Sequence, residues 1–125
     1  MQTALIVDDS ASIRAIVGFA LRNAGFEVIE GTDGQDGLSK LDGRAVDVII
    51  TDLNMPVMDG ITFIKHVRAR VATRFTPLLM LTTESQPSFK QLGKAAGATG
   101  WIVKPVHPSK LLEVIAKVLP MRRQV

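Results

Sequence analysis

Five short segments of the chain have the composition of β-strands. Three of them are almost wholly apolar instead of alternating, which is typical of strands buried on both faces of a parallel sheet: residues 4–7, 46–51 and 78–81. Residues 27–30 alternate polar and apolar side chains, as an edge strand does, and residues 100–103 form a short segment between Gly97 and Pro105. The pattern predicts a sheet of five strands.

Apolar side chains between and after these segments recur with the spacing of amphipathic helices. The expected helices cover about residues 10–25, 34–41, 60–70, 85–97 and 108–119. Ser10 or Ser12 can cap the first helix, and Asn23-Ala24-Gly25 ends it. A proline stands near the start of each of the last two, where its missing N–H group does no harm. Each strand is therefore followed by one helix.

Five strand–helix units in succession predict an α/β domain with a parallel sheet. Right-handed crossovers put helices on both faces of such a sheet, and five units suit the flavodoxin-like, doubly wound strand order 2-1-3-4-5. The chain has 125 residues, close to the usual size of one domain, and its sequence shows no linker, repeat or low-complexity segment. We expect residues 1–125 to form a single domain.

Composition narrows the functional classes. The chain has no cysteine, which excludes disulfides, thiolate metal sites and a cysteine nucleophile and fits a cytoplasmic location. The N-terminal residues do not form a secretory signal, and no run approaches ~18 apolar residues, so we expect no membrane insertion. The net charge of +3 comes from scattered basic residues with only 5% aromatics, which does not favour direct nucleic-acid binding.

Four predicted strands end in polar or charged side chains. These are Asp8 and Asp9, Asp52, Thr82 and Thr83, and Lys104 followed by Pro105. In a parallel sheet the carboxyl ends of the strands meet at one edge, where ligands of open α/β sheets bind. We therefore expect three carboxylates, a hydroxyl and an ammonium group to lie close together.

Clustered carboxylates raise one another's pKa unless a cation offsets their charge. Magnesium suits such oxygen ligands, whereas zinc would need histidine or cysteine. A carboxylate beside Mg²⁺, Lys104 and Thr82 has the equipment to form an aspartyl phosphate, and Asp52 is the expected nucleophile because it is the lone carboxylate on the central strand. Other aspartates are interpreted as turn formers or helix caps: Asp33, Asp36, Asp42, Asp47 and Asp59.

Four motifs carry a specific resemblance. They are the acidic pair in LIVDDS, the segment TDLNMPVMDG around Asp52, the LTTES turn at Thr82, and GATGWIVKP leading into Lys104. With these motifs the sequence resembles a response-regulator receiver domain, and in particular the stand-alone chemotaxis CheY type. The resemblance spans essentially the whole chain and implies the CheY-like fold, a doubly wound five-stranded sheet with five helices.

The resemblance implies that Asp52 is the phosphoacceptor, which takes a phosphoryl group from a phosphohistidine on a histidine kinase of the CheA type. Asp9 and Asp52 would bind Mg²⁺ directly, together with the backbone carbonyl of Asn54, and Asp8 would act largely through water. Lys104 would pair with Asp52 and then with the phosphoryl group. The chain would thus be a signalling switch that catalyses its own phosphorylation and dephosphorylation.

The same resemblance assigns a switch. Thr82 would move toward the phosphoryl group and donate a hydrogen bond to it. Trp101 stands where the family carries its switch aromatic, and the movement of Thr82 would vacate space for the ring. An ordinary anchor on an edge strand is the alternative for Trp101. Lys104 and Pro105 match the family's cis peptide bond, which would aim the lysine into the site.

The family tunes dephosphorylation at positions close to the phosphoacceptor and the switch threonine. Asn54 and Glu84 match the chemotaxis type there, which implies a short-lived signal. Thr83 is larger than the Ala or Gly often found at its position and would restrict entry of water or a phosphatase. Residues 86–88 would lie near a position where partners of the family dock.

Several outputs are compatible with this chemistry. The expected one is binding of a cytoplasmic monomer to a flagellar motor switch protein of the FliM type, with a phosphatase as a further partner. A phosphorelay carrier would instead pass phosphate from Asp52 to another histidine. A Mg²⁺-dependent aspartyl phosphatase would usually need an Asp-x-Asp motif and a cap over the substrate. A transcription regulator would act on DNA only indirectly, because six residues follow Leu119.

Overall fold

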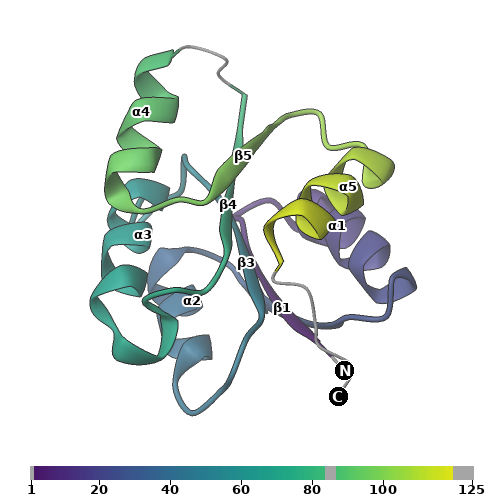
Figure 1. Ribbon diagram of the computed structural model, residues 1–125, viewed down its shortest axis with the longest axis horizontal. Helices are drawn as coiled ribbons and strands as arrows, with labels where there is room; N and C mark the ends of the chain where they lie inside the picture. Colours follow the sequence, from purple (N-terminus) through teal and green to yellow (C-terminus); the bar gives the residue numbers. More distant parts are fainter. Residues whose placement is uncertain (1, 84–86, 120–125) are drawn as a thin grey trace.

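A five-stranded sheet lies at the centre of the computed structural model, which describes residues 2–83 and 87–119 (Figure 1). Its strands are β1 (Thr3–Val7), β2 (Glu27–Gly31), β3 (Val48–Asp52), β4 (Leu78–Thr82) and β5 (Gly100–Val103). The helices are α1 (Ala11–Asn23), α2 (Gly34–Leu41), α3 (Gly60–Ala69), α4 (Pro87–Ala96) and α5 (Pro108–Val118), with a short 3-10 helix, η1 (Val71–Thr73), after α3. Strands and helices alternate as predicted, and only η1 is additional.

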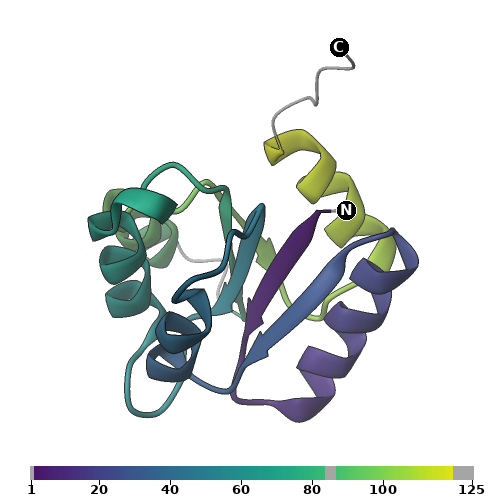
Figure 2. The ribbon, with the colours of Figure 1, turned by 90° about the horizontal axis from the view of Figure 1, so that it is seen from below.

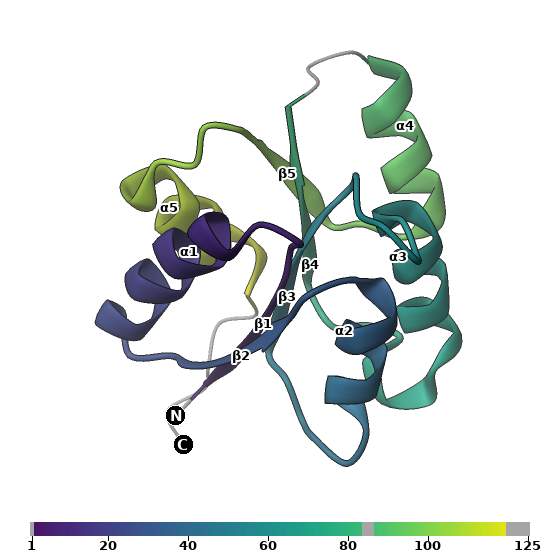
Figure 3. The same ribbon diagram turned by 180° about the vertical axis from the view of Figure 1, so that it is seen from behind.

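All neighbouring strands are parallel, and their order is β2-β1-β3-β4-β5. Helices α1 and α5 cover one face of the sheet, and α2, α3 and α4 cover the other. Figure 1 shows this division, and the views in Figure 2 and Figure 3 agree with it. The predicted doubly wound α/β fold is therefore confirmed, including the position of β2 at an edge.

Two apolar cores separate the sheet from its two layers of helices. Successive strand side chains point to opposite faces, so Leu5 and Val7 pack toward α2 and α3, whereas Ala4 and Ile6 pack toward α1 and α5. Both pairs are fully buried. This burial on two faces is the physical reason that the central strands are continuous apolar runs in the sequence.

Strand β3 differs from its predicted range, because it begins at Val48 and ends at Asp52. At its start, Asp47 binds β1 partly through its side chain, whose Oδ2 accepts the Thr3 N–H group at 2.7 Å. At its end, Asp52 still pairs with β4 in the sheet register, and β4 itself extends to Thr82. Two of the predicted site residues are thus part of the sheet ladder rather than of the loops that follow it.

Of the five aspartates that were interpreted as turn formers or caps, three bind backbone N–H groups within four residues, whereas Asp42 and Asp47 bind residues far away in the sequence. Asp33 and Asp59 are the N-caps of α2 and α3, and each accepts a backbone N–H group three residues further on at 2.8 Å. Asp36 accepts a backbone N–H group four residues before it, and Asp47 accepts one from β1. Asp42 follows α2 and forms an ion pair with a basic residue after α3. None of these five belongs to the carboxylate cluster described below.

The helix ends place the loops that surround the sheet. Ser10 caps α1, because its Oγ accepts the Ile13 N–H group at 3.3 Å. Gly25 and Gly97 follow α1 and α4 with φ of 94° and 118°, in the left-handed region that favours glycine. Arg68 holds the second turn, since its Nε donates to the Gly97 carbonyl at 2.8 Å. Within the described ranges, no helix is long and apolar enough to cross a bilayer.

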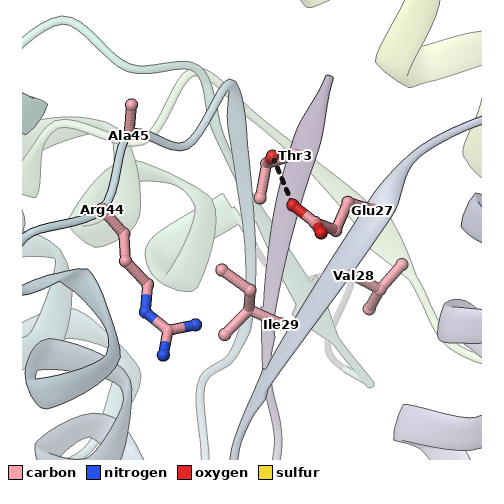
Figure 4. A pocket seen from close by; sticks show the side chains of 6 residues that line it. All are labelled: Thr3, Glu27, Val28, Ile29, Arg44 and Ala45. Atoms are coloured by element: carbon pink, nitrogen blue, oxygen red, sulfur yellow. Dashed lines mark hydrogen bonds between the residues drawn. The ribbon is translucent and has the colours of Figure 1, made fainter. Parts of the chain in front are cut away.

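A shallow hollow lies where strands β1 and β2 begin, at the end of the sheet opposite to Asp8 (Figure 4). Its lining residues are Thr3, Glu27, Val28, Ile29, Arg44 and Ala45. The one contact between polar side chains drawn there joins Thr3 Oγ1 to Glu27 Oε1 at 3.4 Å. This hollow offers a single carboxylate, whereas the predicted site residues lie at the other end of the strands.

Candidate functional site

The register of the sheet places the ends of β1 and β3 side by side. Val7 lies opposite Thr51, so Asp8 and Asp52, the next residue of each segment, are neighbours. Asp8, Asp9 and Asp52 each offer a carboxylate oxygen, and these oxygens lie within 4.8 Å of one another. Asp8 and Asp52 are buried, while Asp9 is exposed. The structure thus brings together the three carboxylates that the sequence places at different strand ends.

Lys104 reaches this cluster from the end of β5. Its Nζ donates to Asp52 Oδ1 at 3.0 Å and lies 3.6 Å from Asp8 Oδ2. The side chains of Asp52 and Lys104 keep 8% and 17% of their exposure, so the pair is shielded but still reachable from solvent. The peptide bond between Lys104 and Pro105 is cis, as the sequence resemblance implied. One ammonium group therefore lies within 3.6 Å of two of the three carboxylates, those of Asp8 and Asp52.

The backbone N–H group and one carboxylate oxygen of Asp8 form hydrogen bonds, whereas its other carboxylate oxygen forms none with the described residues. Its backbone N–H group donates to the Gly31 carbonyl at 3.1 Å, and its Oδ1 accepts the Ser10 N–H group at 2.9 Å. Its Oδ2 is buried and accepts no hydrogen bond from the described residues. Burial raises the pKa of Asp8 above its ordinary value, and the charges of the other two carboxylates add to this, while Ser10 and Lys104 oppose it.

We expect Asp8→Asn to stabilise the metal-free protein at neutral pH by about 1 kcal/mol, as active-site substitutions that relieve buried charge commonly do. Because the pKa of Asp8 is raised in the folded state, protonation of Asp8 stabilises the fold at pH values below the ordinary carboxyl pKa. This stabilisation is lost as the pH rises through the pKa of the folded state. Urea unfolding at several pH values measures the difference, which will vanish in acid. The exposed Asp9→Asn is the control, and an equal gain there would contradict the explanation.

The chemistry of this donor set fits a hard divalent cation. Carboxylate oxygens are the ligands that Mg²⁺ takes, together with water and backbone carbonyls. The buried, unsatisfied Oδ2 of Asp8 faces the cluster, and a nearby cation would offset both its burial and the mutual repulsion of the three anions. The cluster holds neither histidine nor cysteine, which zinc would favour. These residues are therefore compatible with Mg²⁺.

Of the remaining predicted site residues, Thr82 lies next to Lys104. Thr82 is buried at the end of β4, and its carbonyl accepts the Lys104 N–H group at 2.7 Å, so these two residues are neighbours. Asn54 is exposed two residues after β3, and Thr83 is exposed directly after β4. Glu84 lies outside the described residues, as do the side chains of residues 86–88. The proposed roles of Asn54, Thr83 and Glu84 in dephosphorylation stay predictions.

Trp101 lies on β5 beside α4 and keeps 37% of its surface exposed. The Lys90 ammonium lies over its indole ring, 4.9 Å from the ring centroid, which is the geometry of a cation–π contact. A small hollow beside the ring is lined by Lys90, Gln91 and Lys94. The indole ring therefore lies at the α4–β5 surface, where a cation covers one of its faces.

One residue close to the cluster, Arg14, was not predicted from the sequence. It stands in the second turn of α1, and its Nη1 donates to the Asp8 carbonyl at 2.7 Å. Its Nε donates to Glu30 Oε1 at 3.0 Å. The available signal was a basic residue near the N-terminus of a helix, where the helix dipole disfavours a cation.

Comparisons with known proteins show the family of this chain. The family model described as "Response regulator receiver domain" matches residues 4–116. Chemotaxis protein CheY1 of Helicobacter pylori is 39% identical over 117 residues, which cover 92% of this chain and 94% of that protein. The phosphate regulon transcriptional regulatory protein PhoB of Escherichia coli is 35% identical over 115 residues, which cover 92% of this chain and 50% of that protein.

A solved structure gives the same picture. The chemotaxis response regulator CheY4 of Vibrio cholerae is 52% identical, covers 95% of this chain and 99% of its own, and superposes with a TM-score of 0.92. The similarity therefore extends over nearly the whole chain. On the family match and on these relatives, the chain belongs to the response regulator receiver domain family and is of the CheY type.

Proposed function

We propose that this receiver domain is a phosphorylation-activated response regulator of a two-component system, which accepts a phosphoryl group on Asp52. The observation that carries the proposal is the position of Asp52, whose Oδ1 lies 3.0 Å from Lys104 Nζ within a cluster of three carboxylates. A carboxylate held between a fixed ammonium group and a cation site is arranged for phosphoryl transfer rather than for stability, because such clusters are costly without a charged ligand.

Transfer from a phosphohistidine is an in-line displacement at phosphorus. An oxygen of the Asp52 carboxylate forms the new P–O bond, the P–N bond to the donor breaks, and the donor imidazole keeps the electron pair and takes up a proton. Lys104 offsets charge on the transferred oxygens, and the Thr82 hydroxyl donates a hydrogen bond to one of them. During dephosphorylation, water attacks the phosphorus, the bond to Asp52 breaks, and phosphate leaves.

Mg²⁺, when bound, neutralises charge on the phosphoryl oxygens. By the pattern of the family, Asp9 and Asp52 would hold it with the Asn54 carbonyl, and Asp8 would contribute largely through water. We expect saturating Mg²⁺ to stabilise the fold by about 2.7 kcal/mol at one hundred times its Kd, and more than Ca²⁺ does at the same concentration. Thermal unfolding with and without metal measures this shift. Asp9→Ala will erase it, and an unchanged shift in that variant would remove Asp9 from the ligand set.

The switch we propose couples the phosphoryl group to the α4–β5 surface through Thr82 and Trp101. Phosphorylation stabilises an inward position of Thr82, which opens space for the ring and changes the surface that partners meet. In the structure the Lys90 ammonium lies over the exposed ring, and a cation–π contact of this kind is worth about 0.5–1 kcal/mol. Lys90 therefore favours the outward ring and opposes activation.

We expect Lys90→Gln to shift the switch toward its active form by about two- to fivefold, the factor that corresponds to that contact. Trp101 is the only tryptophan, so its fluorescence reports the ring directly. The measurement is the change in fluorescence at half-saturating beryllofluoride with Mg²⁺. Lys94→Gln is the matched control, because Lys94 lines the same hollow without lying over the ring. Equal responses in the two variants would sink the proposed contact, and a wild-type spectrum that beryllofluoride leaves unchanged would count against rotation of the ring.

For the output we propose that a cytoplasmic, monomeric form takes phosphate from a CheA-type histidine kinase and binds a flagellar motor switch protein of the FliM type. The similarity to chemotaxis proteins CheY1 and CheY4 supports this assignment. The test mixes the phosphorylated protein with a motor switch protein and with a histidine phosphotransfer protein. Binding to the first supports the proposal, whereas transfer to the second without motor binding indicates a phosphorelay carrier. Rapid turnover of unrelated phosphate esters would instead indicate an aspartyl phosphatase.

A further inference from the structure

Arg14 occupies an unfavourable position unless something compensates its charge. It lies near the N-terminus of α1, where the unpaired N–H groups make a positive pole, and the first turn of this helix holds no acidic residue. Its side chain is only 15% exposed, so solvent offsets little of the charge. A cation in such a place needs specific partners, and these identify what it does.

The Arg14 guanidinium has two partners that lie on different elements. Its Nε donates to Glu30 Oε1 at 3.0 Å, on edge strand β2, and its Nη1 donates to the Asp8 carbonyl at 2.7 Å, at the end of β1. Glu30 is itself held, because its backbone carbonyl accepts from Lys40 Nζ at 2.8 Å and its Oε2 lies 3.5 Å from Arg22 Nη2. A planar guanidinium that bonds in two directions fixes both partners relative to each other.

The bond from Arg14 completes the fixation of Asp8. The N–H group of Asp8 donates to the Gly31 carbonyl, its carbonyl accepts from Arg14, and its Oδ1 accepts from the Ser10 N–H group. The polar atom left over is the buried Oδ2, which lies in the carboxylate cluster 3.6 Å from Lys104 Nζ. With its other polar atoms bonded, Asp8 has little freedom to turn this oxygen away from the cluster.

We infer that Arg14, anchored by Glu30, is a positioning residue for the acidic pair Asp8 and Asp9. It holds the backbone at Asp8 and thereby sets the geometry in which the cluster binds a divalent cation. The inference rests on the proposed function only in taking Mg²⁺ as the cation. Arg14 does not touch the cation or the phosphoryl group, so it acts through the Asp8 carbonyl.

Positioning and plain electrostatics predict opposite results for this residue. Arg14 is a cation close to a cation site, so removing its charge would tighten Mg²⁺ binding if charge were all that mattered. If it holds Asp8 in place, removing it will weaken binding, since outer-shell partners of metal ligands typically contribute a factor of ten or more. The sign of the change therefore decides between the two.

The experiment measures the Kd of Mg²⁺ by isothermal titration calorimetry on the full chain. We expect Arg14→Gln to weaken binding by about tenfold. Glu30→Gln, which leaves Arg14 without its anchor, will weaken binding in the same direction by a smaller factor. Arg22→Gln is the matched control. It also removes an arginine that pairs with Glu30, but Arg22 has no bond to Asp8. Its Kd will stay within about twofold of the wild type.

Each outcome bears on the inference. Tighter binding in Arg14→Gln, or equal losses in Arg14→Gln and Arg22→Gln, would overturn it. If Arg14→Gln does not fold, as judged by circular dichroism, Arg14→Lys decides the matter, because lysine keeps the charge but lacks the planar group that bonds Glu30 and the Asp8 carbonyl at once. Weaker Mg²⁺ binding in that variant supports positioning, and unchanged binding overturns it. Failure of the proposed function looks different, since the wild-type protein would then neither bind Mg²⁺ nor take up a phosphoryl group.

Discussion

Asp52→Asn will abolish labelling by acetyl phosphate and binding of beryllofluoride, to the limit of detection. The side-chain amide of asparagine has nearly the size and shape of the carboxylate, so the fold and the sheet register at residue 52 will persist. The amide lacks the anionic oxygen that attacks phosphorus, and it removes one of three carboxylates from the cation site. Lys104 will lose the negative charge of its 3.0 Å partner, although the amide oxygen can still accept a hydrogen bond, and its remaining ion pair is with Asp8, 3.6 Å away. Acid-quenched incorporation of labelled phosphate measures the loss.

A matched control for this substitution is Asp59→Asn. Asp59 caps α3 through a hydrogen bond to the Thr62 N–H group at 2.8 Å, and asparagine is as good a cap as aspartate. This variant therefore makes the same chemical change a short distance along the chain and will be labelled like the wild type. Full labelling of Asp52→Asn would remove Asp52 from its role and redirect attention to the other two carboxylates.

Gly60→Ala will destabilise the protein by about 2–4 kcal/mol and weaken Mg²⁺ binding as well. Gly60 begins α3 directly behind the site, and its N–H group donates to the Leu53 carbonyl at 2.9 Å. A Cβ added there would overlap the Asp52 carbonyl oxygen and lie 2.7 Å from Leu53 Cα. Both obstacles are backbone atoms, so no side-chain rotation can relieve the clash. The end of β3, which carries the Asp52 carboxylate, would have to shift.

Gly18→Ala makes the same change in another buried position and will have the opposite sign. Gly18 lies in the middle of α1, where a Cβ would lie 3.1 Å from Nη1 at the flexible end of Arg22 and 3.8 Å from Val28 Cγ1, an ordinary van der Waals contact. Alanine is the better helix former by about 1 kcal/mol, so this variant will be neutral or more stable. Urea unfolding of both variants measures the contrast. A loss in Gly18→Ala as large as that in Gly60→Ala would show that added volume, rather than backbone overlap, is responsible.

Much of the architecture could be read from local patterns. The apolar runs around Leu5, Ile50 and Leu79 predict strands buried on both faces, because only a sheet covered by helices on both sides hides every side chain of a strand. The candidate site followed from the same logic, since parallel strands bring Asp8, Asp52 and the residues after β5 to one edge. The ends of the elements were predicted less exactly than their order. The start of β3 is an example, because hydrogen bonds of Asp47 with β1 decide where strand pairing begins.

Residue types and their order along the chain were sufficient to predict the α/β fold, the strand order and the set of charged groups at the strand ends. The folded arrangement determined how those groups are held. The burial of Asp8 Oδ2, the bridge from Glu30 through Arg14 and the contact of Lys90 with Trp101 each join residues from different elements. Periodicity along one element predicts which of its faces is buried, but it does not predict which side chains of other elements that face will meet, because those contacts depend on how the helices pack on the sheet.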